Sequence, residues 1–289
     1  MFKSGFVNIF GRPNAGKSTL LNALTGEKLA IISPKVQTTR HRIKSFINGD
    51  DYQIILSDTP GIITPEYKLH EKMMQAVKSS LEDADVAILL ADVNDDPEKM
   101  DNVFSSLKLK VPVLLVLNKV DKVSASKLQG VHHFFSSRPY GKTIIEISAL
   151  NNTGTDKLIS EVLARLPEGD PFYDPDELTD LPLRFFAAEL IREKIYAFFQ
   201  EELPYQATVI VRAFEEKTTL TKIVADIVVS RESQKAIFLG EKGSMIRKLG
   251  TESRLSLEAF LGRKVFLELF VKVRPKWREN EGFLREYGY

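Results

Sequence analysis

The residues with the most chemical information lie near the N-terminus, in the run Gly11-Arg-Pro-Asn-Ala-Gly-Lys-Ser18. This run has the form G-x-x-x-x-G-K-[ST], in which glycines let the backbone wrap closely around phosphates and the following helix places its positive end beneath them. The apolar residues 6–10 before it read as a buried strand, and residues 17–24 read as the helix. Lys17 is expected to reach the β and γ phosphates, and Ser18 to offer its hydroxyl to Mg²⁺. The motif predicts a nucleotide site without identifying the base.

A second motif, Asp58-Thr-Pro-Gly61, follows the apolar run 52–56, so its aspartate is expected at the carboxyl end of a strand. Ligands of open α/β sheets collect at that edge. A carboxylate there can hold Mg²⁺ through a water molecule, and the amide of Gly61 can sense a γ-phosphate. The D-x-x-G pattern is weak by itself because acidic turns are common, so its weight comes from its place after the first motif.

The third motif, Asn118-Lys-Val-Asp121, follows the apolar run 111–117 and identifies the base. The Asp121 carboxylate can accept hydrogen bonds from N1–H and the 2-amino group of guanine, whereas adenine would present a lone pair to it. A site built on buried hydrogen bonds rejects a mismatched ligand by about 10⁴-fold. Asn118 is expected to connect this loop to the phosphate loop and the base edge, while the stem of Lys119 covers one face of the ring.

The last motif, Ser148-Ala-Leu150, follows the predicted strand 142–147, and the Ala149 N–H can donate to guanine O6. The four motifs together predict a GTP site. The residues predicted to contact the nucleotide are Gly11, Arg12, Pro13, Asn14, Ala15, Gly16, Lys17, Ser18, Thr19, Asp58, Thr59, Pro60, Gly61, Ile62, Asn118, Lys119, Asp121, Ser148, Ala149 and Leu150.

In this order the motifs resemble those of the translation-factor-related GTPases. That resemblance implies a threonine between the first two motifs whose hydroxyl binds Mg²⁺ once GTP is present. Thr39, in the polar and basic run 35–42, is our choice and Thr38 is the alternative. The run is expected to be a mobile switch loop, although a plain solvated loop would have the same composition. The predicted catalytic residues are Lys17, Thr39 and Gly61, and the predicted Mg²⁺ ligands are Ser18, Thr39 and Asp58.

One position departs from the Ras-like enzymes, which carry a glutamine after D-x-x-G to orient the attacking water. Here the position is Ile62, which can neither donate to water nor accept from it. Hydrolysis must therefore use main-chain groups, a cation or a partner, and is expected to be slow alone. The chain is similar to GTPases with a hydrophobic residue here, some of which bind K⁺ through the phosphate-loop asparagine. That residue is Asn14 here, and its alternative role is only to brace the phosphate loop.

Composition limits the class of protein. The 289 residues leave room for two ordinary domains, with 43% hydrophobic and 27% charged residues. Cysteine is absent, which excludes disulfides and thiolate metal sites and suits a reducing cytoplasm. We see no signal peptide and no apolar run near the ~20 residues of a membrane span.

Residues 167–182 mark a domain boundary, because they contain four prolines, six acidic residues and no basic residue. Such a segment fits neither a helix interior nor a central strand, so it reads as an extended linker. Phe172 and Tyr173 are candidates to pin it onto a neighbouring surface. We predict a GTPase domain over residues 1–170, a proline-rich acidic linker over 171–183 and a second domain over 184–289. The β-α-β alternation of the first domain, with helices near 67–83, 96–108 and 155–166, predicts a doubly wound α/β sheet.

The second domain reads as α-β-β-α-α-β. The predicted helices are 183–202, 233–239 and one capped by Ser244 that runs to about Leu261, and the predicted strands are 207–214, 221–230 and 265–273. Gly240-Glu-Lys-Gly243 lies between the last two helices. This order resembles a type II KH domain, a smaller α+β module that clamps single-stranded RNA at its glycine loop. The predicted RNA-binding residues are Gly240, Glu241, Lys242, Gly243, Arg247 and Lys248.

Charge supports a polyanionic partner for this domain. Residues 231–278 hold 12 Lys or Arg against 5 acidic residues, a local charge of +7 that leaves −6 for the rest of the chain. The basic cluster also includes Arg254, although a merely solvated helix face is an equal interpretation of these charges. Trp277, the only tryptophan, is expected either to stack on a base or to cap a small core.

A GTPase domain joined to a type II KH domain resembles the Era family of bacterial ribosome-assembly GTPases over nearly the full length, including Gln37-Thr-Thr-Arg-His-Arg42. The resemblance implies binding of GTP or GDP with Mg²⁺, and of 16S rRNA near its 3′ end during assembly of the 30S subunit, with hydrolysis timing release. It also implies a cytoplasmic monomer without a DNA partner, with peripheral association at the inner face of the membrane as a further expectation. The competing hypothesis is a membrane-associated signalling GTPase whose basic domain binds anionic lipid, which no lipidation motif or strongly amphipathic basic helix supports.

Overall fold

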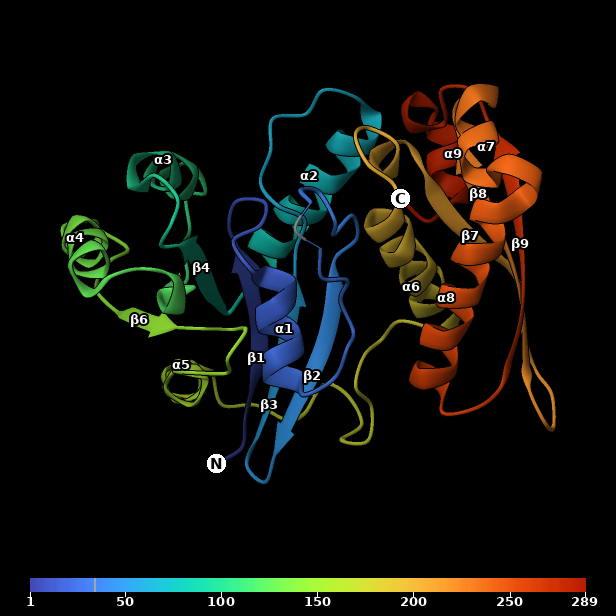
Figure 1. Ribbon diagram of the computed structural model, residues 1–289. Coiled ribbons are helices and arrows are strands. Elements are labelled where there is room, and N and C mark those ends of the chain that lie inside the picture. The colour runs from blue at the N-terminus through green and yellow to red at the C-terminus, as the bar shows by residue number, and fades with distance from the viewer. Residues whose placement is uncertain (34) are drawn as a thin grey trace. The chain divides into compact units, whose positions relative to one another are not determined.

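The computed structural model describes residues 1–33 and 35–289, and these residues divide into two compact units. The first unit comprises Met1–Pro65 and His70–Asp180. The second comprises Glu66–Leu69 and Leu181–Tyr289. Figure 1 shows the chain from blue at the N-terminus to red at the C-terminus, with a sheet and its helices in each unit.

The first unit is built on a six-stranded sheet with the strand order β2-β3-β1-β4-β5-β6. Neighbouring strands are parallel except for β2, which pairs antiparallel with β3 at one edge. The strands are β1 (Lys3–Phe10), β2 (Ile43–Gly49), β3 (Tyr52–Asp58), β4 (Val86–Asp92), β5 (Val113–Asn118) and β6 (Ile144–Ile147). The helices are α1 (Lys17–Thr25), α2 (Lys68–Glu82), α3 (Pro97–Ser106), α4 (Ala125–Ser136) and α5 (Thr155–Leu163). The predicted doubly wound fold is confirmed.

The centre of the sheet is apolar because helices must cover both faces of parallel strands. Every residue of β4 is buried. Alternate side chains of a strand point to the same face, and Ala87, Leu89 and Ala91 share one core cluster with Phe104 of α3 and Phe135 of α4. This packing fixes the sheet from which the loops of the site extend.

The predicted motifs all begin where a strand ends. β1 ends at Phe10, β3 at Asp58, β5 at Asn118 and β6 at Ile147, each directly at or before a motif. Because these strands are parallel and adjacent through β4, their carboxyl ends lie at the same edge of the sheet. The fold therefore brings four segments that are far apart in the sequence to one place.

Three elements of the first unit were not predicted from the sequence. Strand β4 is one of them, although it is wholly buried and lies between β1 and β5 in the sheet. Strand β2 is the antiparallel edge strand, and only part of its length is buried. Helix α4 carries polar side chains over most of its surface, with Val131 and Phe135 buried. Its start does have a local signal, because the Ser124 side chain accepts a hydrogen bond from the Lys127 N–H as an N-cap.

The proline-rich acidic segment packs on the first unit as far as Asp180 instead of standing free as a spacer. The Tyr173 ring stacks on Phe46 with centroids 3.9 Å apart, and Phe172 meets Phe6 edge-on at 5.0 Å. Gln53 Oε1 accepts from the backbone N–H groups of Phe172 and Tyr173, at 2.7 and 3.0 Å. The two aromatic residues thus pin the segment, as their positions in the sequence indicated.

The second unit has the predicted α-β-β-α-α-β order, followed by a short helix that was not predicted, and a three-stranded sheet with the order β7-β8-β9. β7 and β8 are antiparallel, and β8 and β9 are parallel. The elements are α6 (Leu183–Phe198), β7 (Thr208–Glu216), β8 (Thr221–Val229), α7 (Glu232–Leu239), α8 (Ser244–Leu261), β9 (Val265–Val273) and α9 (Glu281–Glu286). Its core joins Ile191 of α6, Ile227 of β8, Phe238 of α7 and Leu257 of α8.

Two details of the second unit differ from the sequence predictions, and a third decides between the two roles expected for Trp277. Ser244 is the first residue of α8, and the capping position belongs to Gly243, whose φ is 76°. Helix α6 ends at Phe198, short of the predicted residue 202, before a 3-10 turn at Pro204–Gln206. Trp277 is fully buried and donates from Nε1 to the Gln206 carbonyl at 3.0 Å, which makes it part of the core and leaves no face for a base.

The residues Glu66–Leu69 belong to the second unit, although they precede most of α2 in the sequence. The Arg278 guanidinium lies 4.3 Å from the centre of the Tyr67 ring, and Lys68 pairs with Glu281 at 2.9 Å. Among the described residues, no helix combines the length and apolar character needed to cross a membrane.

Candidate functional site

A cavity of about 360 Å³ opens at the carboxyl edge of the first unit's sheet. This volume lies in the range of small-ligand pockets. Residues of all four motifs line it, together with the loop after α1. The lining residues are Pro13, Asn14, Gly16, Lys17, Ser18, Thr19, Ile31, Ile32, Ser33, Gln37, Thr38, Thr39, Gly61, Asn118, Lys119, Asp121, Lys122 and Leu150.

The phosphate loop needs its glycine next to the lysine. Gly16 has a φ of 99°, and a Cβ there would lie 2.3 Å from Asn118 Nδ2. No side chain fits that contact, so the glycine permits the close approach of two loops. The first residues of α1, which starts at Lys17, line the cavity. The N-terminus of a helix is suited to binding an anion.

Lys17 is a buried cation. Its Nζ donates to the carbonyls of Gly11 and Arg12, at 3.1 and 3.0 Å. Burial lowers the pKa of the Lys17 ammonium to about 8, against the opposing effect of the Asp58 carboxylate. A buried ammonium that donates to backbone carbonyls favours the arrival of an anion.

Three oxygen-bearing side chains converge beside it. Ser18 Oγ donates to Asp58 Oδ2 at 2.6 Å, Thr39 Oγ1 donates to the same oxygen at 3.1 Å, and the two hydroxyls lie 2.9 Å apart. Burial raises the pKa of the Asp58 carboxyl, against the Lys17 charge and these hydrogen bonds. Thr38 Oγ1 instead donates to the Lys35 carbonyl at 2.8 Å, so the structure places Thr39, and not Thr38, in the set.

This set fits a magnesium ion. Within the described residues, Asp58 Oδ1 is buried and lacks a hydrogen-bond partner. A buried carboxylate oxygen without a partner is costly unless a cation or ordered water satisfies it. Hydroxyl and carboxylate oxygens are the ligands that Mg²⁺ takes, usually together with waters and substrate phosphates.

Asn118 holds the loops of the site together. Its Nδ2 donates to the Ala15 carbonyl at 2.8 Å, and its Oδ1 accepts from the Ala149 N–H at 3.0 Å. The connection to the phosphate loop is the one expected from the sequence. The Ala149 N–H, expected to donate to guanine O6, is engaged by Asn118 in this structure.

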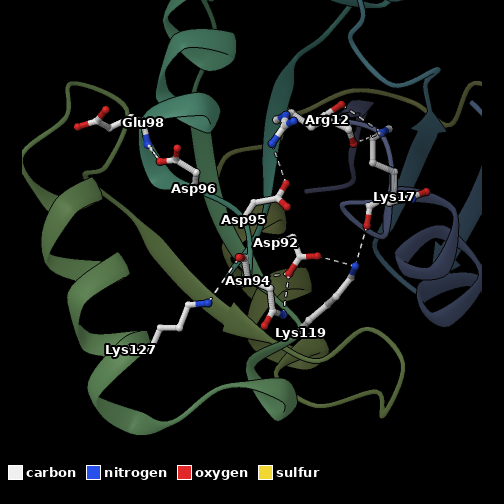
Figure 2. Close-up of polar contacts among 11 residues, drawn as sticks. Arg12, Lys17, Asp92, Asn94, Asp95, Asp96, Glu98, Lys119 and Lys127 are labelled. Atoms are coloured by element: carbon white, nitrogen blue, oxygen red, sulfur yellow. Dashed lines mark hydrogen bonds and ion pairs between the residues drawn. The ribbon is translucent and has the colours of Figure 1, made fainter. Parts of the chain in front are cut away.

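The remaining base-site residues lie at the rim. Asp121 is exposed and lines the cavity, and so does Leu150. Lys119 has a φ of 67°, and its Nζ donates to the Asn14 carbonyl at 2.8 Å and to Asp92 Oδ2 at 2.6 Å. Figure 2 shows Asp92 between Lys119 and Asn94. Of these rim residues, Lys119 is held in place by two acceptors, the Asn14 carbonyl and the Asp92 carboxylate.

Several predicted residues do not line the cavity. They are Gly11, Arg12, Ala15, Asp58, Thr59, Pro60, Ile62, Ser148 and Ala149. Some of them support its walls: Thr59 Oγ1 donates to the Ile9 carbonyl at 2.7 Å, and the Ile62 N–H donates to the Gly11 carbonyl at 3.2 Å. Arg12 turns to Asp95, with 3.1 Å between Nη1 and Oδ2 (Figure 2).

Sequence reasoning missed the lining residues 31–33, Gln37 and Lys122, which no motif marks. It also missed Asp92, for which a signal exists. The wholly apolar run 86–91 ends in this single carboxylate, and the carboxyl end of a central strand is where ligand-site residues gather.

The second unit presents the glycine loop between α7 and α8. Gly240 has a φ of 68°, and a Cβ there would lie 2.7 Å from the Met245 Cβ. Lys242, Arg247 and Lys248 are exposed around the loop. Lys248 Nζ lies 5.0 Å from the Phe198 ring centre.

Arg254, expected in the same basic cluster, pairs with Glu258 at 3.0 Å on its own helix. Lys242, Arg247 and Lys248 are therefore the members of the predicted cluster that are exposed at the loop and the first turns of α8. A helix N-terminus with exposed cations and close backbone approach suits a phosphate backbone.

Comparison with known proteins matches parts of both units to known families. Residues 6–119 match the family described as 50S ribosome-binding GTPase, and residues 194–278 match the KH domain. GTPase Era of Ruminiclostridium cellulolyticum is 43% identical over 291 residues, covering 100% of this chain and 98% of the relative. GTPase Era of Geotalea uraniireducens is 42% identical, with 100% and 98% covered.

Two solved structures are similar over the full length. Era in complex with MgGDPNP and nucleotides 1506–1542 of 16S ribosomal RNA has a TM-score of 0.95 at 40% identity, with 100% of this chain and 99% of that chain covered. A variant of Aquifex aeolicus Era bound to GDP and AlF₄⁻ has a TM-score of 0.94 at 39% identity, with the same coverage. The motifs, both matched domains and the full-length relatives agree, and this chain belongs to the GTPase Era family.

Proposed function

We propose that this GTPase binds GTP with Mg²⁺ in the first unit and the 3′ end of 16S rRNA in the second, and that it acts in assembly of the 30S subunit. The nucleotide half of this proposal is carried by the convergence of four motifs on one cavity, beside the Asp58 oxygen that is buried and has no hydrogen-bond partner among the described residues. The second half is supported by the match to the KH domain and by the similar Era structure that holds 16S rRNA.

In the proposed site, the N–H groups at the start of α1 and the Lys17 ammonium bind the phosphates. Ser18, Thr39 and Asp58 would hold Mg²⁺, Asp58 through a water. The ion supplies neutralisation of the charge that develops on the phosphate oxygens. The Gly61 amide would sense the γ-phosphate. The hydrogen bonds of Ser18 and Thr39 to Asp58 place the three residues that would hold the ion next to one another.

Hydrolysis has no glutamine to orient the attacking water, because Ile62 follows Gly61. Main-chain groups, a monovalent cation or the ribosomal partner must do so, and the isolated protein is proposed to turn over slowly. Asn14 is the proposed K⁺ ligand. Its backbone is left-handed, with a φ of 63°, and it lines the cavity.

In the second unit, the proposed RNA contacts are Gly240–Gly243, Arg247 and Lys248. The glycines allow the sugar-phosphate backbone to approach, and the exposed cations supply attraction that falls with salt. Ribosomal subunits assemble in the cytoplasm, so the proposal places this chain there as a monomer on precursor 30S particles. Peripheral association with the inner face of the membrane would use the same cations.

Base choice tests the proposed nucleotide site. Asp121→Asn should lose affinity for GTP and gain affinity for xanthosine triphosphate, because xanthine carries an oxygen where guanine has its 2-amino group. We expect a loss of about 10²-fold or more for GTP, since hydrogen bonds to a charged group are removed. Fluorescence titration of both proteins with labelled GTP, ATP and XTP measures it. A wild-type preference for ATP would refute the guanine assignment.

Competition tests the proposed RNA partner. The wild-type chain should bind a single-stranded RNA of the 16S 3′-end sequence, and vesicles of anionic lipid should displace it weakly. Filter binding with vesicles of neutral lipid as the control measures both. Tight lipid binding without RNA binding would instead support the membrane-associated switch.

A further inference from the structure

Asp92 is a buried carboxylate at the end of β4 that none of the four motifs contains. Its Oδ2 accepts from Lys119 Nζ at 2.6 Å. Its Oδ1 accepts from the backbone N–H and the side-chain amide of Asn94, at 2.9 and 3.0 Å (Figure 2). Burial acts to raise the pKa of Asp92, but the hydrogen bonds from Lys119 and Asn94 outweigh it and the pKa lies below its usual range. The residue is therefore a fixed anion.

The partner of this anion is the lysine of the base motif. Lys119 Nζ reaches two acceptors at once, the Asp92 carboxylate and the Asn14 carbonyl at 2.8 Å. Asn14 belongs to the phosphate loop, and both Asn14 and Lys119 have left-handed backbone conformations, with φ of 63° and 67°. The ammonium thus joins three loops, which follow β1, β4 and β5.

The loop after β4 makes a second contact with the phosphate loop. Asp95 pairs with Arg12 at 3.1 Å, with about a third of each side chain exposed. Exposed pairs contribute little because water and salt screen them. The Lys119–Asp92 pair is better shielded, with 27% and 11% of the two side chains exposed. Asp92 is therefore the stronger of the two links.

We propose that Asp92 is a positioning residue that holds Lys119 against the Asn14 carbonyl and thereby sets how long a guanine nucleotide stays bound. The inference rests on the proposed function, in which the stem of Lys119 covers one face of the base. Without the carboxylate, the ammonium loses its counter-charge and turns to water. The stem of Lys119 then leaves the face of the guanine ring, and the loop that contains residues 118–121 separates from the phosphate loop.

The test is the dissociation rate of labelled GDP from the full chain, chased with unlabelled GDP. Asp92→Ala should raise this rate about tenfold or more, since a charge-assisted hydrogen bond is lost. Asp92→Asn, which keeps the shape and removes the charge, should give a smaller rise in the same direction. Inosine diphosphate lacks the 2-amino group of guanine. Asp92→Ala should speed its release, relative to release from wild type, by the same factor as it speeds the release of GDP, because Asp92 acts through the ring face and not through the base edge.

Asp96→Ala is the matched control. Asp96 lies in the same loop and caps α3 by accepting from the Glu98 N–H at 3.0 Å (Figure 2). Its loss should lower the unfolding temperature and leave the GDP dissociation rate within twofold of wild type. An equal rise in both variants would show that loop stability alone governs release, and would overturn the proposal.

A double-mutant cycle with Lys119→Ala separates this inference from the proposed function. Once Lys119 is absent, Asp92→Ala should add nothing to the GDP dissociation rate. If Lys119→Ala speeds release and Asp92→Ala does not, the positioning role fails while the guanine site stands. If wild type does not retain GDP, or Lys119→Ala leaves release unchanged, the proposed role of Lys119 at the base fails instead.

Discussion

The two glycine loops of this chain contrast in how they hold positive charge. In the phosphate loop, Lys17 is only 6% exposed, and its ammonium rests on two backbone carbonyls. Around the second loop, Lys242 and Arg247 are exposed at the end of a helix pair. Both loops contain a glycine with positive φ, Gly16 in the first and Gly240 in the second. In the proposed function, each glycine lets the backbone approach a phosphate.

In the proposed function, this difference follows from the size of each ligand. A nucleotide enters a cavity, so its charge meets a desolvated cation and buried donors, and selectivity comes from hydrogen bonds that a wrong base leaves unmade. A polymer cannot be enclosed in this way, so an open loop attracts it through screened charges and releases counterions. The first site should therefore resist salt and the second should not.

The largest effect is expected from Lys17→Met, which removes the buried cation. Nucleotide affinity should fall by at least about 10²-fold, because charged hydrogen bonds contribute roughly 1.5–3 kcal/mol each. Without nucleotide, the variant should be more stable than wild type near neutral pH, because burial of the ammonium opposes folding. Isothermal titration with GTP analogue and urea unfolding of the nucleotide-free proteins measure the two effects.

The sign of the pH dependence follows from the lowered pKa of Lys17. Below pH 8 the lysine is charged in both the folded and unfolded states, so the cost of burial is fully present. Between about 8 and 10.5 the unfolded state holds more protons, and wild-type stability rises relative to Lys17→Met by on the order of 1–3 kcal/mol. A stability difference that stays constant over this window would contradict the buried-charge account.

The next effect separates the two loops. Gly243→Asp should reduce RNA affinity more than tenfold and leave GTP affinity unchanged, because a carboxylate would stand where phosphates approach. The Cβ itself has room, since its nearest neighbour would be 3.9 Å away. Filter binding at several salt concentrations measures it, and wild-type RNA affinity should fall steeply with salt.

Gly262→Asp is the matched control, with a φ of 64° against 76° at Gly243 and no atom of the described part of the chain within 4 Å of a Cβ built there. Both substitutions carry the same left-handed strain, on the order of 1 kcal/mol. Gly262 ends α8 at the opposite end from the loop. Equal losses of RNA affinity in both variants would place the RNA site elsewhere or reveal a general folding defect.

The contrast between the loops also marks what the sequence could predict. The phosphate loop, the strand ends and the α-β-β-α-α-β order were predictable because each depends on short-range spacing. The role of Asp92 was not, because its partner Lys119 is 27 positions away and no local pattern links them. The same holds for Trp277, whose type fits a base or a core equally well, and whose hydrogen bond to the Gln206 carbonyl depends on the folded unit.

A smaller effect should connect the two sites. We expect RNA to bind more tightly with a non-hydrolysable GTP analogue than with GDP, by about 1–2 kcal/mol. The segment that follows Gly61 is a physical basis for this coupling, because Glu66–Leu69 belongs to the second unit, with Tyr67 beneath Arg278. Reciprocity requires RNA to tighten analogue binding by the same factor. Equal RNA affinity in both nucleotide states would mean that the sites act independently.

The smallest effect is expected at the position where other GTPases keep their water-orienting glutamine. Ile62 is partly buried and packs against the core cluster that contains Phe104 and Phe135. Ile62→Ala should therefore lower stability by about 1 kcal/mol for a partly buried side chain. It should change single-turnover hydrolysis by less than about threefold, because the isoleucine has no polar atom to offer water.

Cation exchange sharpens this last comparison. If Asn14 helps to hold K⁺, hydrolysis by wild type and by Ile62→Ala should fall alike when K⁺ is replaced by Na⁺, and Asn14→Ala should remove the difference between the two salts. A rate that is the same in both salts would leave the main chain or the ribosomal partner to orient the water. A large loss in Ile62→Ala in both salts, with the fold intact by thermal unfolding, would instead show that the isoleucine shapes the attack site through packing.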